Sequence, residues 1–449
     1  MTVASPLKRR EIVDALRLGA VPRHGLELFA VGLDRFEKVI DEELEAAAAG
    51  RGKLKAVRGD YGTGKTFFAS WLAHRARQRG FATTLVQISE SDTPLYRMET
   101  VYRRAIEALQ TREWASGAFR SLVDRWFYNL EEEAMAQPGA AEADAEAVSD
   151  AVGKLLEQRL AVVSATQPQF AAALRRCHAA RVKEEHAVAE GLIAWLMGQP
   201  NVAADIKRAA GLKGDVDHDG AAGFLRGLLE LLKQTGRSGL VLVLDEVETI
   251  QRVRTDSREK SLNALRQLID DLSAGRFPGL YVLVTGTPQF FDGPQGVQRL
   301  PPLAQRLQTD FGKDPRFDSA RAVQIRLQPF SFDRLVEVGR RVRDLYPSDS
   351  PERIAARVDD ELLASLAHGI AGKLGGKVGM APRLYLKRLV GLLDQVDEHP
   401  DFDPREHHEL VVLANEMTDE EREAAGVTRS VADIQLDIGP SGRGRGELE

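Results

Sequence analysis

The stretch GDYGTGKT, from Gly59 to Thr66, indicates the fold of this chain. It matches the pattern G-x-x-x-x-G-K-[ST], in which backbone N–H groups of a glycine-rich turn surround phosphate groups. The glycines allow the tight backbone path that points successive N–H groups at the phosphates. We expect Lys65 to reach the β- and γ-phosphates and the hydroxyl of Thr66 to ligate Mg²⁺. The stretch therefore predicts a binding site for a nucleotide, ATP, with Mg²⁺.

The sequence around this loop has the order that such a site requires. A short, mostly apolar run, Leu54 to Val57, precedes it, and a helical pattern from Lys65 to about Arg79 follows. The next apolar run, Ala82 to Ile88, is typical of a strand. Strand, loop, helix and strand in this order indicate a parallel sheet covered by helices. The residues expected to surround the nucleotide are Gly59, Asp60, Tyr61, Gly62, Thr63, Gly64, Lys65, Thr66 and Phe67.

A second apolar run, LVLVLDEVE from Leu240 to Glu248, ends in acidic residues. Beside a phosphate-binding loop, Asp245 is expected to hold Mg²⁺, through water, and Glu246 to orient or deprotonate the attacking water. Acidic residues at an ordinary strand end are the alternative interpretation. The adjacent Asp-Glu pair favours hydrolysis over binding alone. Glu248 is a weaker candidate, which we expect to face a neighbouring side chain.

A third apolar run, LYVLVTGTP from Leu280 to Pro288, ends in threonines. Inserted beside the acidic strand, it would place Thr285 or Thr287 near the γ-phosphate, and we take Thr285 as the candidate sensor. A strand-terminating turn built from Thr, Gly and Pro is the alternative.

Between and after these runs the pattern is helical. Strand signals are absent from about Leu95 to Lys233, and a helical pattern returns from Pro329 to Val396. The predicted fold class is α/β: a P-loop parallel sheet with a large helical insertion and a C-terminal helical lid. The predicted divisions are an N-terminal helix with the first part of the nucleotide-binding domain (1–94), the insertion (95–235), the second part of that domain (236–328), the lid (329–400) and a charged tail (401–449).

Composition excludes several classes of protein. The 449 residues include a single cysteine, Cys177, which excludes a disulfide framework and a cysteine-cluster metal site. A net charge of −6, from 61 basic and 67 acidic residues, argues against a globally basic nucleic-acid binder. No run approaches the roughly 18 apolar residues of a membrane span, so we expect a cytoplasmic protein that does not enter a membrane.

The three runs, in this order and before a helical domain, resemble the AAA+ ATPases, in the branch of origin-recognition-type and STAND-related proteins. The resemblance implies that Leu28 to Ile40 packs over the adenine. It also implies an arginine of the lid that reaches back to the γ-phosphate, and Arg383 in MAPRLYLKRLV, Met380 to Val390, is the candidate. A solvated arginine at a helix start is the alternative there.

In that branch, hydrolysis across a subunit interface uses an arginine finger, so the resemblance implies a homo-oligomer. Arg299, Arg306 and Arg316 all follow the third apolar run. Arg306, in PLAQRLQ, is the preferred candidate.

Four strings together resemble the BrxD family of ATP-binding proteins from bacteriophage-exclusion (BREX) systems. They are GDYGTGKTFF, QISESDTPLYRMETVYRRAIEAL, LDEVETI and TGTP, and the resemblance runs from about Arg10 to Val396. It implies a phage-defence ATPase whose partner is DNA or a helicase, such as the Lhr-like helicases encoded nearby.

Two basic clusters are candidates for DNA contact, although charged helical faces are more often only solvated. They comprise Arg175, Arg176, Arg181 and Lys183 in the insertion, and Arg252, Arg254, Arg258 and Lys260 in an expected loop.

The sequence supports two hypotheses for the function. The first is a Mg²⁺-dependent ATPase that drives a partner acting on DNA. The second is a nucleotide-gated switch with little turnover that signals to a protein partner.

Overall fold

The computed structural model describes residues 5–137, 145–373 and 382–407. In this part of the chain, five strands form one parallel sheet in the order β2-β3-β4-β1-β5. The strands are β1 (Lys53–Arg58), β2 (Ala82–Gln87), β3 (Leu240–Asp245), β4 (Leu280–Gly286) and β5 (Gln324–Arg326). The predicted α/β class is confirmed. Strand β5 was not predicted, because three residues are too few to show a period.

Both faces of the sheet are buried, which explains why its strands are apolar runs without alternation. In β3, Leu240, Leu242 and Leu244 belong to one hydrophobic core cluster, and Val241 and Val243 belong to a second on the opposite face. Successive side chains of a strand point to opposite faces, so one strand serves both clusters.

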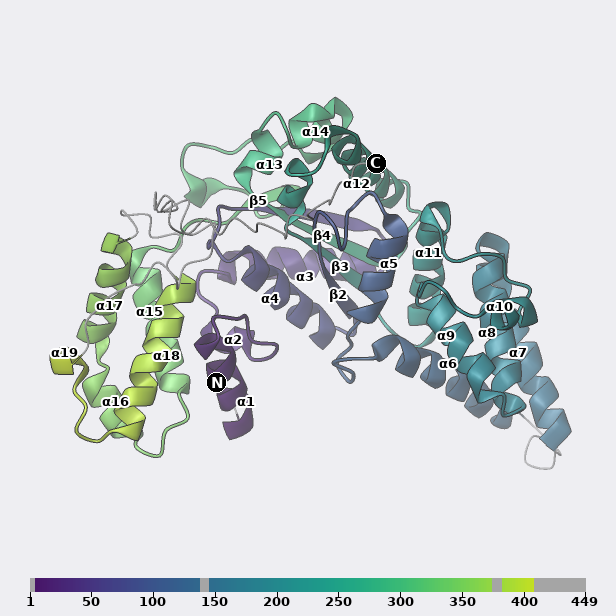
Figure 1. Ribbon diagram of the computed structural model, residues 1–449, viewed down its shortest axis with the longest axis horizontal. Helices are drawn as coiled ribbons and strands as arrows, with labels where there is room; N and C mark the ends of the chain where they lie inside the picture. The colour runs from purple at the N-terminus through teal and green to yellow at the C-terminus, as the bar shows by residue number, and fades with distance from the viewer. Residues whose placement is uncertain (1–4, 138–144, 374–381, 408–449) are drawn as a thin grey trace, which may run out of the picture.

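Helices cover each face of the sheet (Figure 1). Helices α3 and α4 contribute to the second cluster through Phe36 and Phe68, whose rings meet edge to face at 5.5 Å. Helix α12 contributes to the first cluster through Leu265. The elements of this domain are α3 (Asp34–Ala48), α4 (Lys65–Gln78), η2 (Val247–Gln251), α12 (Thr255–Ser273), α13 (Pro288–Asp292), η3 (Val297–Arg299), α14 (Pro301–Leu307) and η4 (Pro315–Phe317).

A group of helices between β2 and β3 lies to one side of the sheet (Figure 1). Phe224 lies at its centre, where its ring packs against Tyr102, Phe170 and Trp195 at 5.2 to 5.7 Å. This packing belongs to the same core cluster as one face of the sheet. The helices are α5 (Met98–Glu107), α6 (Ala118–Met135), α7 (Ala145–Thr166), α8 (Pro168–Val182), α9 (His186–Leu196), α10 (Ala204–Ala209) and α11 (His218–Gln234).

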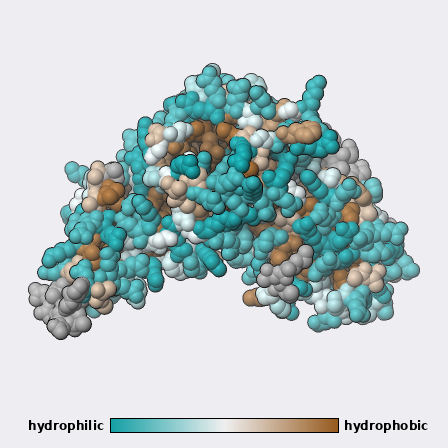
Figure 2. Space-filling model, turned by 180° about the vertical axis from the view of Figure 1, so that it is seen from behind, coloured by the Kyte–Doolittle hydropathy of each residue, from teal (hydrophilic) through white to brown (hydrophobic). Residues whose placement is uncertain are grey.

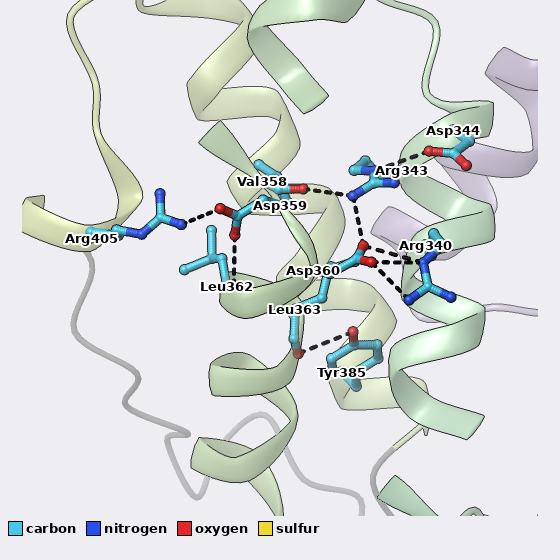
Figure 3. A network of polar contacts seen from close by, with 10 residues as sticks. All are labelled: Arg340, Arg343, Asp344, Val358, Asp359, Asp360, Leu362, Leu363, Tyr385 and Arg405. Atoms are coloured by element: carbon cyan, nitrogen blue, oxygen red, sulfur yellow. Dashed lines mark hydrogen bonds and ion pairs between the residues drawn. The ribbon is translucent and has the colours of Figure 1, made fainter. Parts of the chain in front are cut away.

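The C-terminal helices, which the sequence predicts to form a lid, lie on the opposite side of the sheet (Figure 1). They are α15 (Phe332–Leu345), α16 (Pro351–Arg357), α17 (Asp360–Lys373), α18 (Pro382–Glu398) and α19 (Pro404–His407). Arg340 and Arg343 of α15 both pair with Asp360 at the start of α17, and Arg405 pairs with Asp359 (Figure 3). Met380 and the tail beyond His407 lie outside the described residues.

The N-terminal helices connect the lid to the sheet domain. They are α1 (Pro6–Arg17) and α2 (Leu26–Phe29). Ser5 caps α1 and Pro6 occupies its first turn, where a missing N–H costs nothing. Helix α1 packs along α18, where Arg17 makes two hydrogen bonds of 2.8 Å to Asp394.

No helix among the described residues is long and apolar enough to cross a membrane. The face seen in Figure 2 is mostly hydrophilic, and its apolar side chains form separate patches, the most evident near the middle of the molecule.

Candidate functional site

The glycine-rich loop connects β1 to α4 at the carboxyl edge of the sheet. Gly62 and Gly64 have φ values of +77° and +90°, a backbone region that other residues enter only with strain. A Cβ on Gly59 would collide with the side chain of Thr63. Helix α4 begins at Lys65 directly after Gly64, so its first N–H groups belong to the loop. The predicted loop geometry for binding an anion is therefore present.

Lys65 is buried, with 8% of its surface exposed. Its ammonium donates hydrogen bonds to the carbonyl oxygens of Gly59 at 2.9 Å and Asp60 at 3.3 Å. The same nitrogen lies 3.7 Å from Glu248 Oε1 and 5.0 Å from the ring centre of Tyr61. The loop's own backbone thus holds the lysine at the place where it would meet a phosphate.

Asp245 connects three elements of the site through its two carboxylate oxygens. Thr66 Oγ1 of α4 donates to Asp245 Oδ2 at 3.0 Å, and the hydroxyl of Thr285, at the end of β4, donates to Asp245 Oδ1. Thr285 Oγ1 also accepts a hydrogen bond from the backbone N–H of Glu246 at 3.1 Å. A carboxylate and a hydroxyl side by side are oxygen ligands of the kind that Mg²⁺ takes. The donor set fits a Mg²⁺ ion at Thr66 and Asp245.

The two candidate threonines of the third run lie in different places. Thr285 is fully buried in contact with the acidic pair. Thr287 caps α13, where its side chain accepts a hydrogen bond from the N–H of Phe290 at 3.4 Å. The turn interpretation therefore describes Thr287, and Thr285 is the one beside Asp245.

Glu246 has a left-handed backbone, with φ +58° and ψ +43°. This conformation costs a non-glycine residue roughly 1–2 kcal/mol, and such strain is typical of functional positions. Its carboxylate accepts a hydrogen bond of 2.9 Å from Gln87 Nε2, at the end of β2. Gln87 was not predicted. What identifies Gln87 is the parallel pairing of β2 with β3, because this pairing puts Gln87 in register with Asp245, next to Glu246.

Glu248 is buried and lines the same cavity, although its sequence pattern made it only a weaker candidate. Burial raises the pKa of its carboxyl, and the charges of Glu246 and Asp245 add to this effect, whereas Lys65 lowers the pKa. The net pKa is raised, because the loss of hydration outweighs the attraction of one ammonium at 3.7 Å. Its neighbour is Lys65, so the expectation that it faces another side chain agrees with the structure.

A cavity of about 300 Å³ opens beside the loop, between the sheet domain, the N-terminal segment and the lid. The segment Leu28 to Ile40 contributes part of its wall, and Tyr61 and Phe67 line it from the loop side. Its apolar lining includes Val21, Pro22, Phe29, Val31, Phe36 and Leu386. A largely apolar chamber that leads to a phosphate-binding loop has the shape and chemistry for a nucleoside with its phosphates.

Two arginines of the lid line this cavity. Arg383, at the start of α18, packs against Gly19, where an added Cβ would lie 3.3 Å from Nη1. Arg334, in the first turn of α15, packs against Gly32, where an added Cβ would lie 3.0 Å from Cζ. Arg383 was predicted and Arg334 was missed. No local pattern distinguishes Arg334 from the other arginines of the lid.

The three arginine-finger candidates do not line the cavity of their own chain. Arg306 pairs with Asp270 and donates to the carbonyl of Pro302 at 2.6 Å. Arg299 pairs with Glu259 at 2.9 Å. Arg316 pairs with Asp314 at 2.6 Å, and 82% of its side chain is exposed.

The basic cluster of the insertion is largely paired with acidic side chains. Its members Arg175, Arg176 and Arg181 pair with Glu157, Glu185 and Asp124.

The second basic cluster is only partly in a loop, which corrects the sequence interpretation. Arg258 and Lys260 lie on α12, which begins at Thr255 and has nineteen residues with amphipathic spacing. Arg258 donates to the carbonyls of Gln251 and Val253, both at 2.9 Å. Arg252 Nη2 lies 3.5 Å from Tyr61 Oη, so this loop borders the phosphate-binding loop.

A five-stranded parallel sheet, a glycine-rich loop before α4 and an acidic strand end bonded to Thr66 define a P-loop nucleotide-binding protein. The family model described as BREX system ATP-binding protein BrxC/D matches residues 4–411. The chain belongs to this family, and the resemblance found in the sequence is confirmed. It is an ATP-binding protein of anti-phage defence. No curated protein and no solved structure matches the chain.

Proposed function

We propose that this protein hydrolyses ATP with Mg²⁺ and that hydrolysis serves a partner acting on DNA. The observation that carries the proposal is the set of contacts around Asp245. Through this one carboxylate, Thr66 of the phosphate loop and Thr285 of β4 are bonded together, with Glu246 adjacent and lining the same cavity. A protein that only held a nucleotide would not need a strained glutamate at this point.

Each residue of the site has a role in this proposal. The loop amides and Lys65 bind the phosphates, helped by the positive end of the α4 dipole. Thr66 and Asp245 would hold Mg²⁺, which supplies charge neutralisation for the transferring phosphoryl group. Glu246 orients the attacking water and accepts its proton. Gln87 fixes the Glu246 carboxylate before the substrate arrives.

The lid completes the site from the other side. Arg383 and Arg334 would bring positive charge to the phosphate end of the cavity, and the apolar segment Leu28 to Ile40 would enclose the adenine. Exclusion of water strengthens each of these electrostatic contacts. Closure of the lid and chemistry at Glu246 would then be coupled, as in other enzymes with lids.

We further propose that the protein forms a homo-oligomer in which Arg306 serves the nucleotide site of a neighbouring subunit. Supporting this, none of Arg299, Arg306 and Arg316 lines the cavity of its own chain. The proposed partner is an Lhr-like helicase or another defence protein. Residues 95–235 are the proposed helical insertion. The nucleotide-binding domain then comprises residues 1–94 and 236–328, the lid comprises residues 329–400, and the charged tail comprises residues 401–449.

The second candidate is a nucleotide-gated switch with little turnover. The observation that favours it is the hydrogen bond between Gln87 and Glu246, which restrains the carboxylate that would activate water. The arginine-finger candidates all lie away from the cavity of their own chain. The protein would then bind ATP and close its lid, and it would keep the ATP intact until it meets a partner.

The test is ATP turnover by the wild type and Glu246→Gln, without DNA and with duplex or single-stranded DNA, alongside the mass in solution. We expect turnover that falls by at least about 100-fold in Glu246→Gln, with ATP binding retained, in an oligomer. Tight binding with negligible turnover in both proteins, whatever DNA is added, would contradict the ATPase and favour the switch.

A further inference from the structure

Glu248 is a buried carboxylate that the proposed reaction does not use. Only 4% of its surface is exposed, and it lines the nucleotide cavity. Neither of its carboxylate oxygens accepts a hydrogen bond from another residue that the structure describes. Glu246 differs, because its carboxylate is bonded to Gln87. A carboxylate buried without a hydrogen bond from a neighbouring residue is costly, so its presence in the cavity needs a reason.

The one ion pair of Glu248 among the described residues is with Lys65. Glu248 Oε1 lies 3.7 Å from Lys65 Nζ, and the two side chains are 4% and 9% exposed. The hydrogen bonds of that ammonium go to the carbonyls of Gly59 and Asp60. The ammonium that is proposed to bind phosphate therefore already has three oxygen neighbours, two from the loop and one from Glu248.

A bound nucleotide would compete with Glu248 for this ammonium. Lys65 has to bind the β- and γ-phosphates, and it then no longer neutralises Glu248. The carboxylate is left in a cavity that now also holds the phosphate charges. Like charges in a poorly hydrated space repel strongly, and the repulsion grows with the number of phosphate charges nearby.

We propose that Glu248 is a positioning residue that competes with the nucleotide for Lys65, and that it lowers affinity for ATP more than affinity for ADP. The inference rests on the phosphate-binding role proposed above for Lys65. Glu248 attracts the same ammonium that the phosphates need. When a nucleotide is bound, the negative charge of Glu248 repels the phosphates. The γ-phosphate contributes the largest part of this repulsion. The residue keeps binding reversible, which a protein that must exchange ADP for ATP requires.

The experiment is calorimetric titration of the full chain with Mg²⁺-ADP and with a Mg²⁺-bound ATP analogue that cannot be hydrolysed. In Glu248→Gln we expect the analogue to bind at least about fivefold more tightly, because the carboxylate charge is removed. The gain for ADP should be smaller. Glu248→Asp, which withdraws the charge by one methylene, should fall between the wild type and Glu248→Gln.

The matched control is Glu43→Gln, which removes the same charge from an ion pair with another buried lysine, Lys55, away from the nucleotide cavity. We expect it to change either affinity by less than about twofold. Equal gains in the two variants would mean that general charge, and not the Lys65 contact, sets affinity, and would overturn the inference.

Weaker or unchanged binding in Glu248→Gln, with a melting temperature like that of the wild type, would also overturn it. If Glu248→Gln does not fold, weaker analogue binding by Glu248→Asp would overturn it in the same way. Both titrations proceed without turnover, so an absence of ATP hydrolysis would contradict the proposed function and leave this result standing. Where turnover is measured, Glu248→Gln should lower KM by a larger factor than it changes kcat.

Discussion

Asp245 is bonded on both sides, and this double contact fixes the geometry of the residues around it. Thr66 and Thr285 donate to different oxygens of one buried carboxylate. Thr285 in turn accepts the N–H of Glu246, so the strained backbone of that glutamate is held by a fully buried hydroxyl. A preorganised carboxylate is effective because it does not have to be oriented at the moment of reaction.

At this residue scale, Gln87→Ala should slow ATP turnover by about tenfold with little change in KM. The substitution removes the amide that fixes the Glu246 carboxylate at 2.9 Å, and orientation of a catalytic group affects the transition state more than binding. Steady-state kinetics check this prediction.

The matched control for Gln87 is Gln199→Ala. Gln199 also donates to a glutamate, Glu107, at 2.9 Å, but neither residue lines the nucleotide cavity. Its kinetics should equal those of the wild type. A faster Gln87→Ala enzyme would show that the amide restrains Glu246 and would favour the switch.

At the scale of elements, the nucleotide cavity is built where three segments meet: the loop before α4, the chain around α2, and the starts of α15 and α18. Gly32 and Gly19 allow the starts of α15 and α18 to approach closely, because each glycine lies directly against an arginine of the lid. The positive φ of both glycines gives a second reason for the absence of a side chain. Close approach of backbone and guanidinium is what brings Arg334 and Arg383 to the cavity.

The corresponding prediction concerns these two arginines. Arg334→Ala and Arg383→Ala should each weaken binding of the ATP analogue by about tenfold, the usual effect of losing a hydrogen bond to a charged group. ADP binding should change less in Arg383→Ala if that residue reaches the γ-phosphate. Titration calorimetry measures both affinities.

Arg340→Ala is the control for the lid. Arg340 lies on α15 like Arg334, but it pairs with Asp360 and does not line the cavity (Figure 3). Its loss should leave nucleotide affinity unchanged. Equal weakening in all three variants would mean that the lid was destabilised and that no single arginine acts on the phosphates.

At the scale of the whole molecule, the sheet lies between two bodies of helices (Figure 1). The core cluster on one face continues into the helices between β2 and β3, and the cluster on the other face continues into the lid. The same strands therefore pack against the lid helices on one face and against the insertion on the other.

The prediction at this scale is that charge reversal at Arg252 and Arg254 weakens DNA binding and reduces its salt dependence. These arginines lie in the loop that borders Tyr61, and each lost phosphate contact lowers the slope of affinity against salt by about one. Binding to labelled DNA at several salt concentrations measures both effects.

Reversal of Arg175 and Arg176 is the matched control, because these residues carry the same charge but are paired with Glu157 and Glu185. It should leave binding unchanged. DNA affinity equal to that of the wild type in the Arg252 and Arg254 variant would exclude this loop as the contact.

Features that depend on short stretches of chain could be predicted from the amino-acid order alone. The phosphate loop, four of the five strands in the described part of the chain, and the Asp245–Glu246 pair are each encoded within about ten residues, where spacing alone carries the information. The family resemblance came from such strings as well, and the match over residues 4–411 confirmed it.

Which distant residues meet at the site is a property of the tertiary structure. Gln87 reaches Glu246 across 159 positions, Arg334 comes to the cavity from the lid, and Arg306 is paired with Asp270. The burial of Glu248 against Lys65 also depends on how η2 packs beside α4. Periodicity reports which face of an element is buried but not which partner covers it. Contacts between elements depend on sheet order and helix packing, and these are set by the whole core at once.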